Sequence, residues 1–423
     1  MTGSPGSRLA TVLAFLGAFA VVLAAFGPAS AQQWNPFADL SASNSSSDIG
    51  FARRWQANPP PGYPTLSPAN IAATQKAIKR YQEIVKDGGW KTIPDKKLAG
   101  GNNDPAVEIL RQRLQLSGDL ESGDAWMPQQ FDYSVEKAVK RFQATNGLAP
   151  TGIVDKRTRA ALNVSAKTRL KQLKKGLSRI RQYTSKTKKG RYVVVNIPSA
   201  QIEAVEDDKV VTRHAGVVGK VSRPSPILSS SIHELNFNPI WRLPPTVVSK
   251  DLIPKGRQME KAGKDVLVKY GIDAYDGSGR KLDPEKIRWS SSQPHGLSYR
   301  QKPGKDNPLG FVKINFHNGH SVYLHDTPSD NLFGRNFRAA SSGCIRVHNI
   351  EDLAAWLLEG KEGWNKSQVV TMRETGESKD VRLKRPVRLY FAYITAWATE
   401  DGVVQFRRDL YGKDGVGSDA GSY

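Results

Sequence analysis

The spacing of apolar residues changes near residue 191, and this change constrains the fold more than any other feature. Before it, apolar residues recur at helical intervals, as Ile78 and Tyr81 do. After it, residues 192–198 and 210–218 are short β-branched runs that are typical of strands. At 423 residues the chain has room for two or three domains. We therefore predict an α+β multidomain protein, with a helical first part and a mostly-β second part.

The N-terminus has the three parts of a secretory signal peptide. Arg8 precedes an apolar run over residues 9–26, and residues 28–31 end in small side chains. We expect residues 1–31 to be removed on export to the periplasm, with a retained membrane anchor as the alternative. Residues 32–70 are rich in Ser, Asn, Pro and Gly, which predicts a flexible linker.

The charge balance restricts the partners of the protein. Lys and Arg number 62 against 40 Asp and Glu, which gives a formal net charge of +22. A protein this basic attracts polyanions. Because an exported protein does not meet nucleic acid, we expect an anionic polymer of the cell envelope as the partner and no nucleic acid.

The helical part divides into three segments. Residues 71–101 predict an N-terminal helical scaffold, and residues 102–164 predict a compact three-helix unit. Residues 165–190 predict a basic amphipathic connecting helix, whose charges form a solvated face or dock on an acidic polymer. In the three-helix unit, the helices are expected to begin at the aspartates Asp104, Asp132 and Asp155.

A predicted hairpin in the β part places a histidine at the end of a strand. Residues 311–317 and 320–325 alternate in polarity and flank Asn318-Gly319, which predicts a hairpin with a tight type I′ turn and puts His325 at its far end.

Residues 251–305, by contrast, are charged, rich in Gly and Pro and show little periodicity. They predict an inserted cap rather than a core element.

The single cysteine, Cys344, lies on a glycine-containing turn. A lone cysteine excludes an intrachain disulfide and a zinc site of several thiolates. Gly343 would let main-chain N–H groups approach a reacting carbonyl. Asn349 is expected to cap the helix that follows, with Asp352 three residues on.

This arrangement suggests nucleophilic chemistry. An imidazole can take the proton of a thiol and form an ion pair with the thiolate, so His325 is the candidate base for Cys344. The alternative is a buried, inert thiol. His317, His320 and His325 could suggest a metal cluster, but no carboxylate completes a site, so we expect neither a metal nor another cofactor.

These motifs resemble two known families. Residues 323–327, Tyr-Leu-His-Asp-Thr, and residues 341–346, Ser-Ser-Gly-Cys-Ile-Arg, resemble the active-site signature of L,D-transpeptidases with the YkuD catalytic domain. Residues 236–241 and the tail 393–397 resemble its YcbB-like branch. Residues 102–164 resemble peptidoglycan-binding domain 1, with a generic helical spacer as the alternative. Many YkuD proteins have Ser-His-Gly-Cys, whereas Ser342 stands here at the histidine position.

The resemblance implies an architecture and a reaction. Residues 191–375 would be the catalytic domain, with residues 251–305 as its inserted cap and residues 376–423 as an extension packed on it. Cys344 would form a thioester with one stem peptide of peptidoglycan and release D-alanine. The amine of a second stem would then accept the acyl group, which gives a 3→3 cross-link.

The resemblance also assigns roles to residues. His325 would be the base, oriented by a main-chain carbonyl, and the N–H groups of Gly343 and Cys344 would bind the oxyanion. The side chain of Asp326 is a less favoured third member. Carbapenem-type inhibitors are expected to acylate Cys344. The residues expected to shape the pocket or bind substrate are Tyr323, Arg338, Ser341, Ser342 and Arg346.

Three alternative functions of this site stay open besides cross-linking. One is a catalytically inactive scaffold that only binds peptidoglycan glycan and stems. Another is an L,D-carboxypeptidase or a D-amino-acid exchange enzyme, in which water or a free amino acid takes the acyl group. The last is an enzyme that anchors a protein to the wall through the same cysteine.

Overall fold

The computed structural model describes residues 63–185 and 190–416. The predicted signal peptide and most of the predicted linker lie outside the described residues. Within the described part of the chain, no helix combines the length and the apolar character that a membrane span requires.

Residues 63–70, the described end of the predicted linker, are packed rather than flexible. The main-chain N–H of Thr65 donates to the carboxylate of Glu203 at 2.8 Å. Tyr192 Oη donates to the carbonyl of Leu66 at 2.9 Å, and the side chain of Leu66 is fully buried. Apolar burial and hydrogen bonding thus hold this segment against the sheet, although its composition is that of a linker.

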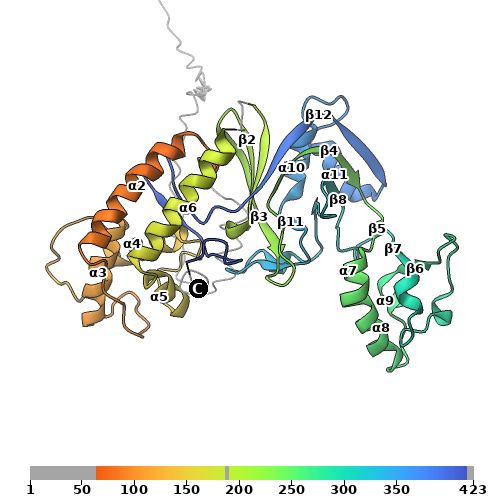
Figure 1. Ribbon diagram of the computed structural model, residues 1–423, viewed down its shortest axis with the longest axis horizontal. Coiled ribbons are helices and arrows are strands. Elements are labelled where there is room, and N and C mark those ends of the chain that lie inside the picture. The colour runs from red at the N-terminus through yellow and green to blue at the C-terminus, as the bar shows by residue number, and fades with distance from the viewer. Residues whose placement is uncertain (1–62, 186–189, 417–423) are drawn as a thin grey trace, which may run out of the picture. The chain divides into compact units, whose positions relative to one another are not determined.

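The helical part follows the predicted pattern. Asp104, Asp132 and Asp155 each accept a main-chain N–H from the first turn of a helix, as expected for N-caps. Helices α2 and α6 run side by side (Figure 1). The helices are α2 (Ala69–Lys86), α3 (Pro105–Ser117), α4 (Tyr133–Thr145), α5 (Lys156–Leu162) and α6 (Ala166–Thr184).

The second part is built on a nine-stranded sheet with the order β10-β3-β11-β9-β8-β4-β12-β1-β2. Strand β2 also pairs with β3, so the sheet closes on itself. The pairs β1–β12, β9–β11 and β3–β10 are parallel. The strands are β1 (Tyr192–Asn196), β2 (Gln201–Glu206), β3 (Lys209–Gly219), β4 (Leu228–Phe237), β8 (Val312–Phe316), β9 (Leu324–His325), β10 (Ala339–Ser341), β11 (Ile345–Val347) and β12 (Lys379–Ala392).

Two helices, α10 (Ile350–Leu358) and α11 (Lys366–Thr375), cover the main core of this sheet. Leu353, Trp356 and Leu357 form the buried stripe of α10, as the sequence predicts. Asn349 directly precedes this helix but does not cap it, because its φ of 48° turns the side chain away from the first turn.

Strand β12 corrects the predicted start of a C-terminal extension at residue 376. This strand pairs with both β4 and β1, so it belongs to the middle of the sheet. Beyond it, β13 (Ala396–Ala398) and β14 (Val404–Phe406) form a two-stranded sheet beside α2 and α6. Arg407 then donates to the carbonyl of Thr145 at 2.9 Å, which ties the end of the chain to the helical part.

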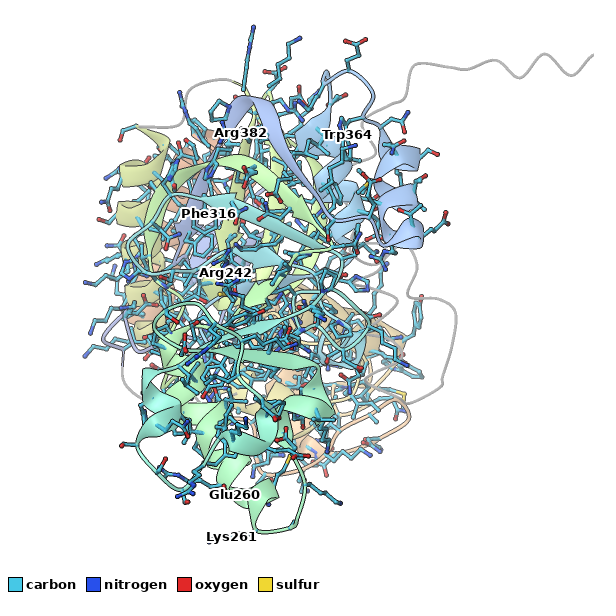
Figure 2. The ribbon with its side chains drawn as sticks, turned by 90° about the vertical axis from the view of Figure 1, so that its right-hand side faces the viewer. Arg242, Glu260, Lys261, Phe316, Trp364 and Arg382 are labelled. Carbon is cyan, nitrogen blue, oxygen red and sulfur yellow. The ribbon has the colours of Figure 1, made fainter. Side chains whose placement is uncertain are left out.

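The inserted cap is larger and better ordered than its composition suggests. It contains a three-stranded sheet, β5-β7-β6, and a hydrophobic core of its own that includes Ile253, Val266 and Trp289. Figure 1 shows its elements grouped together, and Figure 2 shows Glu260 and Lys261 at the end far from Arg242. Its elements are β5 (Trp241–Arg242), α7 (Pro245–Val247), the short π-helix η2 (Val248–Leu252), α8 (Ile253–Glu260), α9 (Val266–Tyr270), β6 (Ile272–Tyr275), η3 (Pro284–Lys286), η4 (Gln293–Gly296) and β7 (Ser298–Gln301).

The hairpin of β8 and β9 forms without the predicted tight turn. Lys313 pairs with His325, which leaves a loop too long for a two-residue connection. The positive φ of 55° is at Ser321 rather than at Asn318. The side chain of Asn318 folds the loop instead, because it hydrogen-bonds the main chain of Phe316, His320 and Val322.

Candidate active site

The parallel strands β9 and β11 bring the predicted nucleophile and base to one face of the sheet. Leu324 pairs with Ile345, and both are fully buried in the main core. Because side chains alternate along a strand, the flanking residues face the other way. The register pairs His325 with Arg346. Tyr323 and Cys344 directly precede the paired residues Leu324 and Ile345, and Tyr323 hydrogen-bonds Cys344. The residues on this face are therefore Tyr323, His325, Cys344 and Arg346.

The turn that carries Cys344 is held closed by Ser341. Ser341 Oγ donates to the carbonyl of Cys344 at 2.6 Å and accepts the N–H of Gly343 at 3.1 Å. Gly343 has a φ of 118°, a conformation that favours glycine. Its N–H is thus already bonded and does not suit the expected oxyanion role. The N–H of Cys344 makes no hydrogen bond to any residue that the structure describes, so it is the better donor.

His325 is set up to accept a proton through Nε2. Its Nδ1 lies 2.6 Å from the carbonyl oxygen of Asp326. Since a carbonyl only accepts, the ring proton must sit on Nδ1, which leaves Nε2 as the acceptor. Burial and, to a smaller extent, the charge of Arg346 together lower the pKa of His325 to about 3. The imidazole is therefore neutral at physiological pH.

Cys344 rests as a thiol. Burial raises its pKa, while hydrogen bonds with Tyr323 and the charges of Lys313 and Arg346 act in the opposite direction. With a neutral imidazole on the same face, the resting pair is a thiol and an imidazole. The sequence suggested an ion pair instead, which these two pKa directions do not favour.

Sequence reasoning missed Lys313 and gave Trp241 no role in the site. Trp241 Nε1, in β5 at the base of the cap, donates to Tyr323 Oη at 3.2 Å. Lys313 Nζ lies 4.7 Å from the centre of the Tyr323 ring, and the pairing of Lys313 with His325 puts it on the catalytic face. Trp241, Lys313 and Tyr323 line a cavity of about 440 Å³. Alternation in β8 was visible in the sequence, but its register against β9 was not.

Ser342 connects the turn that carries Cys344 to the cap. Arg223 Nη1 donates to Ser342 Oγ at 2.8 Å. The same guanidinium forms an ion pair of two hydrogen bonds with Asp251 of the short π-helix η2, at 2.6 and 3.1 Å. Paired bonds of this kind fix both position and orientation. The predicted pocket residue Ser342 is therefore part of a link between the cap and the turn.

Arg346 fits the predicted role of binding a substrate carboxylate. Its Nη1 has a long contact of 3.4 Å with Thr327 Oγ1. Its Nε is buried without a hydrogen-bond partner among the described residues. A buried donor without a hydrogen bond costs free energy of folding, unless an acceptor atom of a ligand supplies that bond.

Arg338 and Asp326 do not have the roles that the sequence suggested. Arg338 donates to main-chain carbonyls, so its guanidinium ties strands together and has few donors left for a substrate. The carboxylate of Asp326 accepts the N–H of Phe311 at 3.0 Å, and only its main-chain oxygen contacts His325. Arg338 donates hydrogen bonds to the carbonyls of Ser199, Ala200, Gly216 and Arg335.

Within the described ranges, no group of His, Cys, Asp and Glu side chains could hold a metal ion.

A second buried histidine, His214 on β3, makes the stability of the protein depend on pH. Burial lowers the pKa of His214 from 6.5 to about 4. Below pH 6.5 the unfolded chain therefore binds a proton that the folded chain does not, and stability falls as the pH falls. We expect the stability advantage of wild type over His214→Asn to shrink between pH 7.5 and pH 4.5. Urea unfolding at several pH values measures it, and a constant difference would contradict this pKa.

Comparison with known proteins identifies two of these segments. Residues 190–370 match the family "L,D-transpeptidase catalytic domain" (YkuD), and residues 103–162 match "Putative peptidoglycan binding domain". The resemblances to the YkuD domain and to peptidoglycan-binding domain 1 are confirmed, as is the predicted order of a helical module and a mostly-β catalytic domain, while the YcbB-like branch stays a prediction.

One curated relative and two solved structures illustrate the similarity. The relative is "Putative L,D-transpeptidase" from Haemophilus influenzae, 34% identical over 226 residues, which are 52% of this chain and 44% of the relative. The chain thus aligns with less than half of that protein. An L,D-transpeptidase of Xylanimonas cellulosilytica is 16% identical with a TM-score of 0.24, covering 71% of this chain and 100% of that one. One of Stackebrandtia nassauensis is 14% identical with a TM-score of 0.25, covering 71% and 96%.

Proposed function

We propose that this chain, whose residues 190–370 form an L,D-transpeptidase catalytic domain, cross-links peptidoglycan stems through a thioester on Cys344. The observation that carries the proposal is the shared face of β9 and β11, on which Cys344 lies diagonally across from a neutral His325. The peptidoglycan-binding domain supports a place at the cell wall. The leader-like residues 1–31 support export to the periplasm.

In the first half-reaction, the donor stem acylates the enzyme. The sulfur of Cys344 attacks the carbonyl before the terminal D-alanine, and its proton passes to Nε2 of His325. The N–H of Cys344 is placed to bind the oxyanion that forms. When the intermediate collapses, the C–N bond breaks and the D-alanine amine takes the proton from Nε2. A thioester and a neutral imidazole remain.

In the second half-reaction, an amine of another stem takes the acyl group. His325 Nε2 accepts a proton from the attacking amine, and the new C–N bond forms as the C–S bond breaks. The proton returns to the sulfur, so the thiol and the neutral imidazole are restored. The product is a 3→3 cross-link, and every proton is accounted for by one imidazole.

Positive charge near the sulfur makes this proton transfer feasible. Burial opposes both a thiolate and an imidazolium, as the pKa directions of Cys344 and His325 indicate. Lys313 and Arg346 both act to lower the pKa of Cys344, so they stabilise negative charge that develops on it. We assign Arg346 a second task, which is to bind a carboxylate of the stem with its unpaired Nε.

A reaction with purified disaccharide-tetrapeptide tests the proposal. We expect mass spectrometry to show dimers that have lost D-alanine and whose fragmentation places the link between two diaminopimelate residues. Cys344→Ala should give no dimer, with circular dichroism as the check on folding. Release of D-alanine with tripeptide as the only product would show that water is the acceptor and would reject cross-linking.

A further inference from the structure

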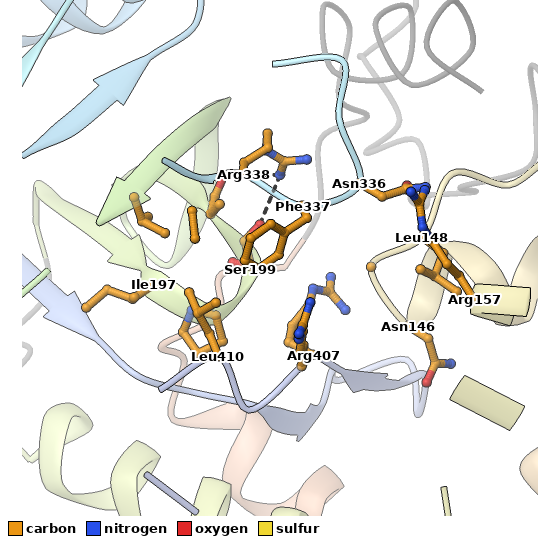
Figure 3. Close-up of a pocket in the computed structure, with 16 residues that line it drawn as sticks. Asn146, Leu148, Arg157, Ile197, Ser199, Asn336, Phe337, Arg338, Arg407 and Leu410 are labelled. Atoms are coloured by element: carbon orange, nitrogen blue, oxygen red, sulfur yellow. Dashed lines mark hydrogen bonds between the residues drawn. The ribbon is translucent and has the colours of Figure 1, made fainter. Parts of the chain in front are cut away.

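A cavity of about 280 Å³ lies between the peptidoglycan-binding domain and the catalytic domain, and Cys344 is not one of its lining residues (Figure 3). Three parts of the chain form its wall, so it exists only where the two domains meet. The main-chain N–H of Ala149 donates to Asn336 Oδ1 at 2.8 Å across this junction. The wall comprises residues 146–148 and Arg157 of the first domain, residues 197–200, Val218 and residues 336–339 of the second, and Arg407, Arg408 and Leu410 beyond it.

The lining of this cavity is strongly basic. Four arginines, and neither Asp nor Glu, belong to its lining in the described part of the chain. Two of them, Arg338 and Arg407, are fixed by bonds to main-chain carbonyls, such as that from Arg407 to Phe406 at 2.7 Å. Because a carbonyl only accepts, such bonds fix the orientation of the guanidinium. The four arginines are Arg157, Arg338, Arg407 and Arg408.

An exposed aromatic ring lies at the same place. Phe337 is 46% exposed, which is unusual for a phenylalanine. The guanidinium of Arg408 lies 4.8 Å from the centre of its ring. An aromatic face next to a cation offers apolar contact and charge to one ligand. A short peptide with carboxylates and aliphatic groups matches both, and the cavity has room for a few residues of it.

We propose that this cavity binds a carboxylate-bearing stem peptide of the peptidoglycan strand, at a subsite separate from the catalytic face. The inference rests on the proposed function for the identity of the polymer. A stem held here would keep the strand beside the catalytic domain, because residues 336–339 of the wall lead directly into Ser341 and the nucleophile turn. The peptidoglycan-binding domain alone would then be an incomplete binding unit.

Sedimentation of the full chain with purified sacculi tests this subsite. Phe337→Ala and Arg408→Ala should each weaken binding by about tenfold, because each removes one desolvated contact with the stem. Arg385→Ala is the matched control, since Arg385 is exposed on β12 and its loss changes the net charge equally. All three variants should keep the wild-type rate on soluble disaccharide-tetrapeptide, because no residue of the catalytic face changes.

A second probe addresses the chemistry of the ligand. The soluble tetrapeptide should bind the Cys344→Ala chain in calorimetry, and adding Arg408→Ala to that chain should weaken the binding, which separates the subsite from the carboxylate contact proposed for Arg346. Sedimentation of Phe337→Ala and Arg408→Ala like wild type, or an equal loss for Arg385→Ala, would overturn the subsite. If these two variants alone lose sacculus binding but wild type makes no dimers, the subsite is supported and the proposed transpeptidation is rejected.

Discussion

Replacing His325 by alanine is expected to lower kcat for cross-linking by about 10³-fold, within the usual contribution of a general acid–base group. The reason is that the same imidazole moves the proton in both half-reactions. KM should change little, because the substrate contacts proposed for Arg346 stay in place. Steady-state kinetics on the disaccharide-tetrapeptide measure both constants. His320→Ala is the matched control, since His320 is exposed in the loop of the same hairpin.

The pH profile distinguishes this account from a preformed ion pair. The pKa of His325 is lowered to about 3 and that of Cys344 is raised above its ordinary value of 9.0. Alkylation of the free enzyme by iodoacetamide should therefore accelerate up to alkaline pH without a plateau between pH 5 and 7. A plateau in that range would show a stable thiolate–imidazolium pair and would contradict the resting state described for this site.

Removal of the cap is expected to lower kcat/KM by about 10²-fold while the catalytic domain stays folded. The cap core is separate from the main core, so its loss leaves the sheet intact. Because Arg242 pairs with Arg300, residues 243–299 can be replaced by an Asn-Gly turn. The deletion takes away Asp251, and with it the ion pair that holds Arg223 against Ser342.

The contribution of this ion pair can be separated from that of the whole cap. Asp251→Asn removes one charge and should lower kcat/KM by about tenfold, because the nucleophile turn loses part of its support. Glu285→Gln, an exposed acidic residue of the same cap, serves as the control.

The unfolding temperature of the variant that lacks residues 243–299 should stay within a few degrees of wild type. A parallel loss of unfolding temperature and activity would show that the cap is structural only.

Local signals in the sequence predicted the local parts of this fold. Aspartates before helices, such as Asp132, cap them because the bond joins residues three positions apart. Cys344 and His325 stay predicted as the catalytic pair, because Cys344 is the single cysteine and residues 341–346 resemble a family signature. The alternation of β8 and β9 was likewise predicted from the polarity of their residues.

The remaining features depend on contacts between distant residues. Lys313 joins the site only because the loop folded by Asn318 shifts the register of β8 against β9. Arg338 looked like a substrate ligand, but four carbonyls take its donors, and three of them belong to distant parts of the sequence. The sequence of the cap resembles that of a loop, because the core of the cap is assembled from short elements. None of these three features can be recognised from a few consecutive residues of the sequence.

The central claim is that Cys344 becomes acylated with the help of His325, and trapping that acyl group tests it most directly. Purified protein incubated with a carbapenem should gain the mass of the inhibitor, and peptide mapping should place it on Cys344. His325→Ala should acquire the same adduct much more slowly, and Cys344→Ala should acquire none. Full-length wild-type protein that is folded and has a titratable thiol, yet gains no mass or carries the adduct elsewhere, would contradict the account.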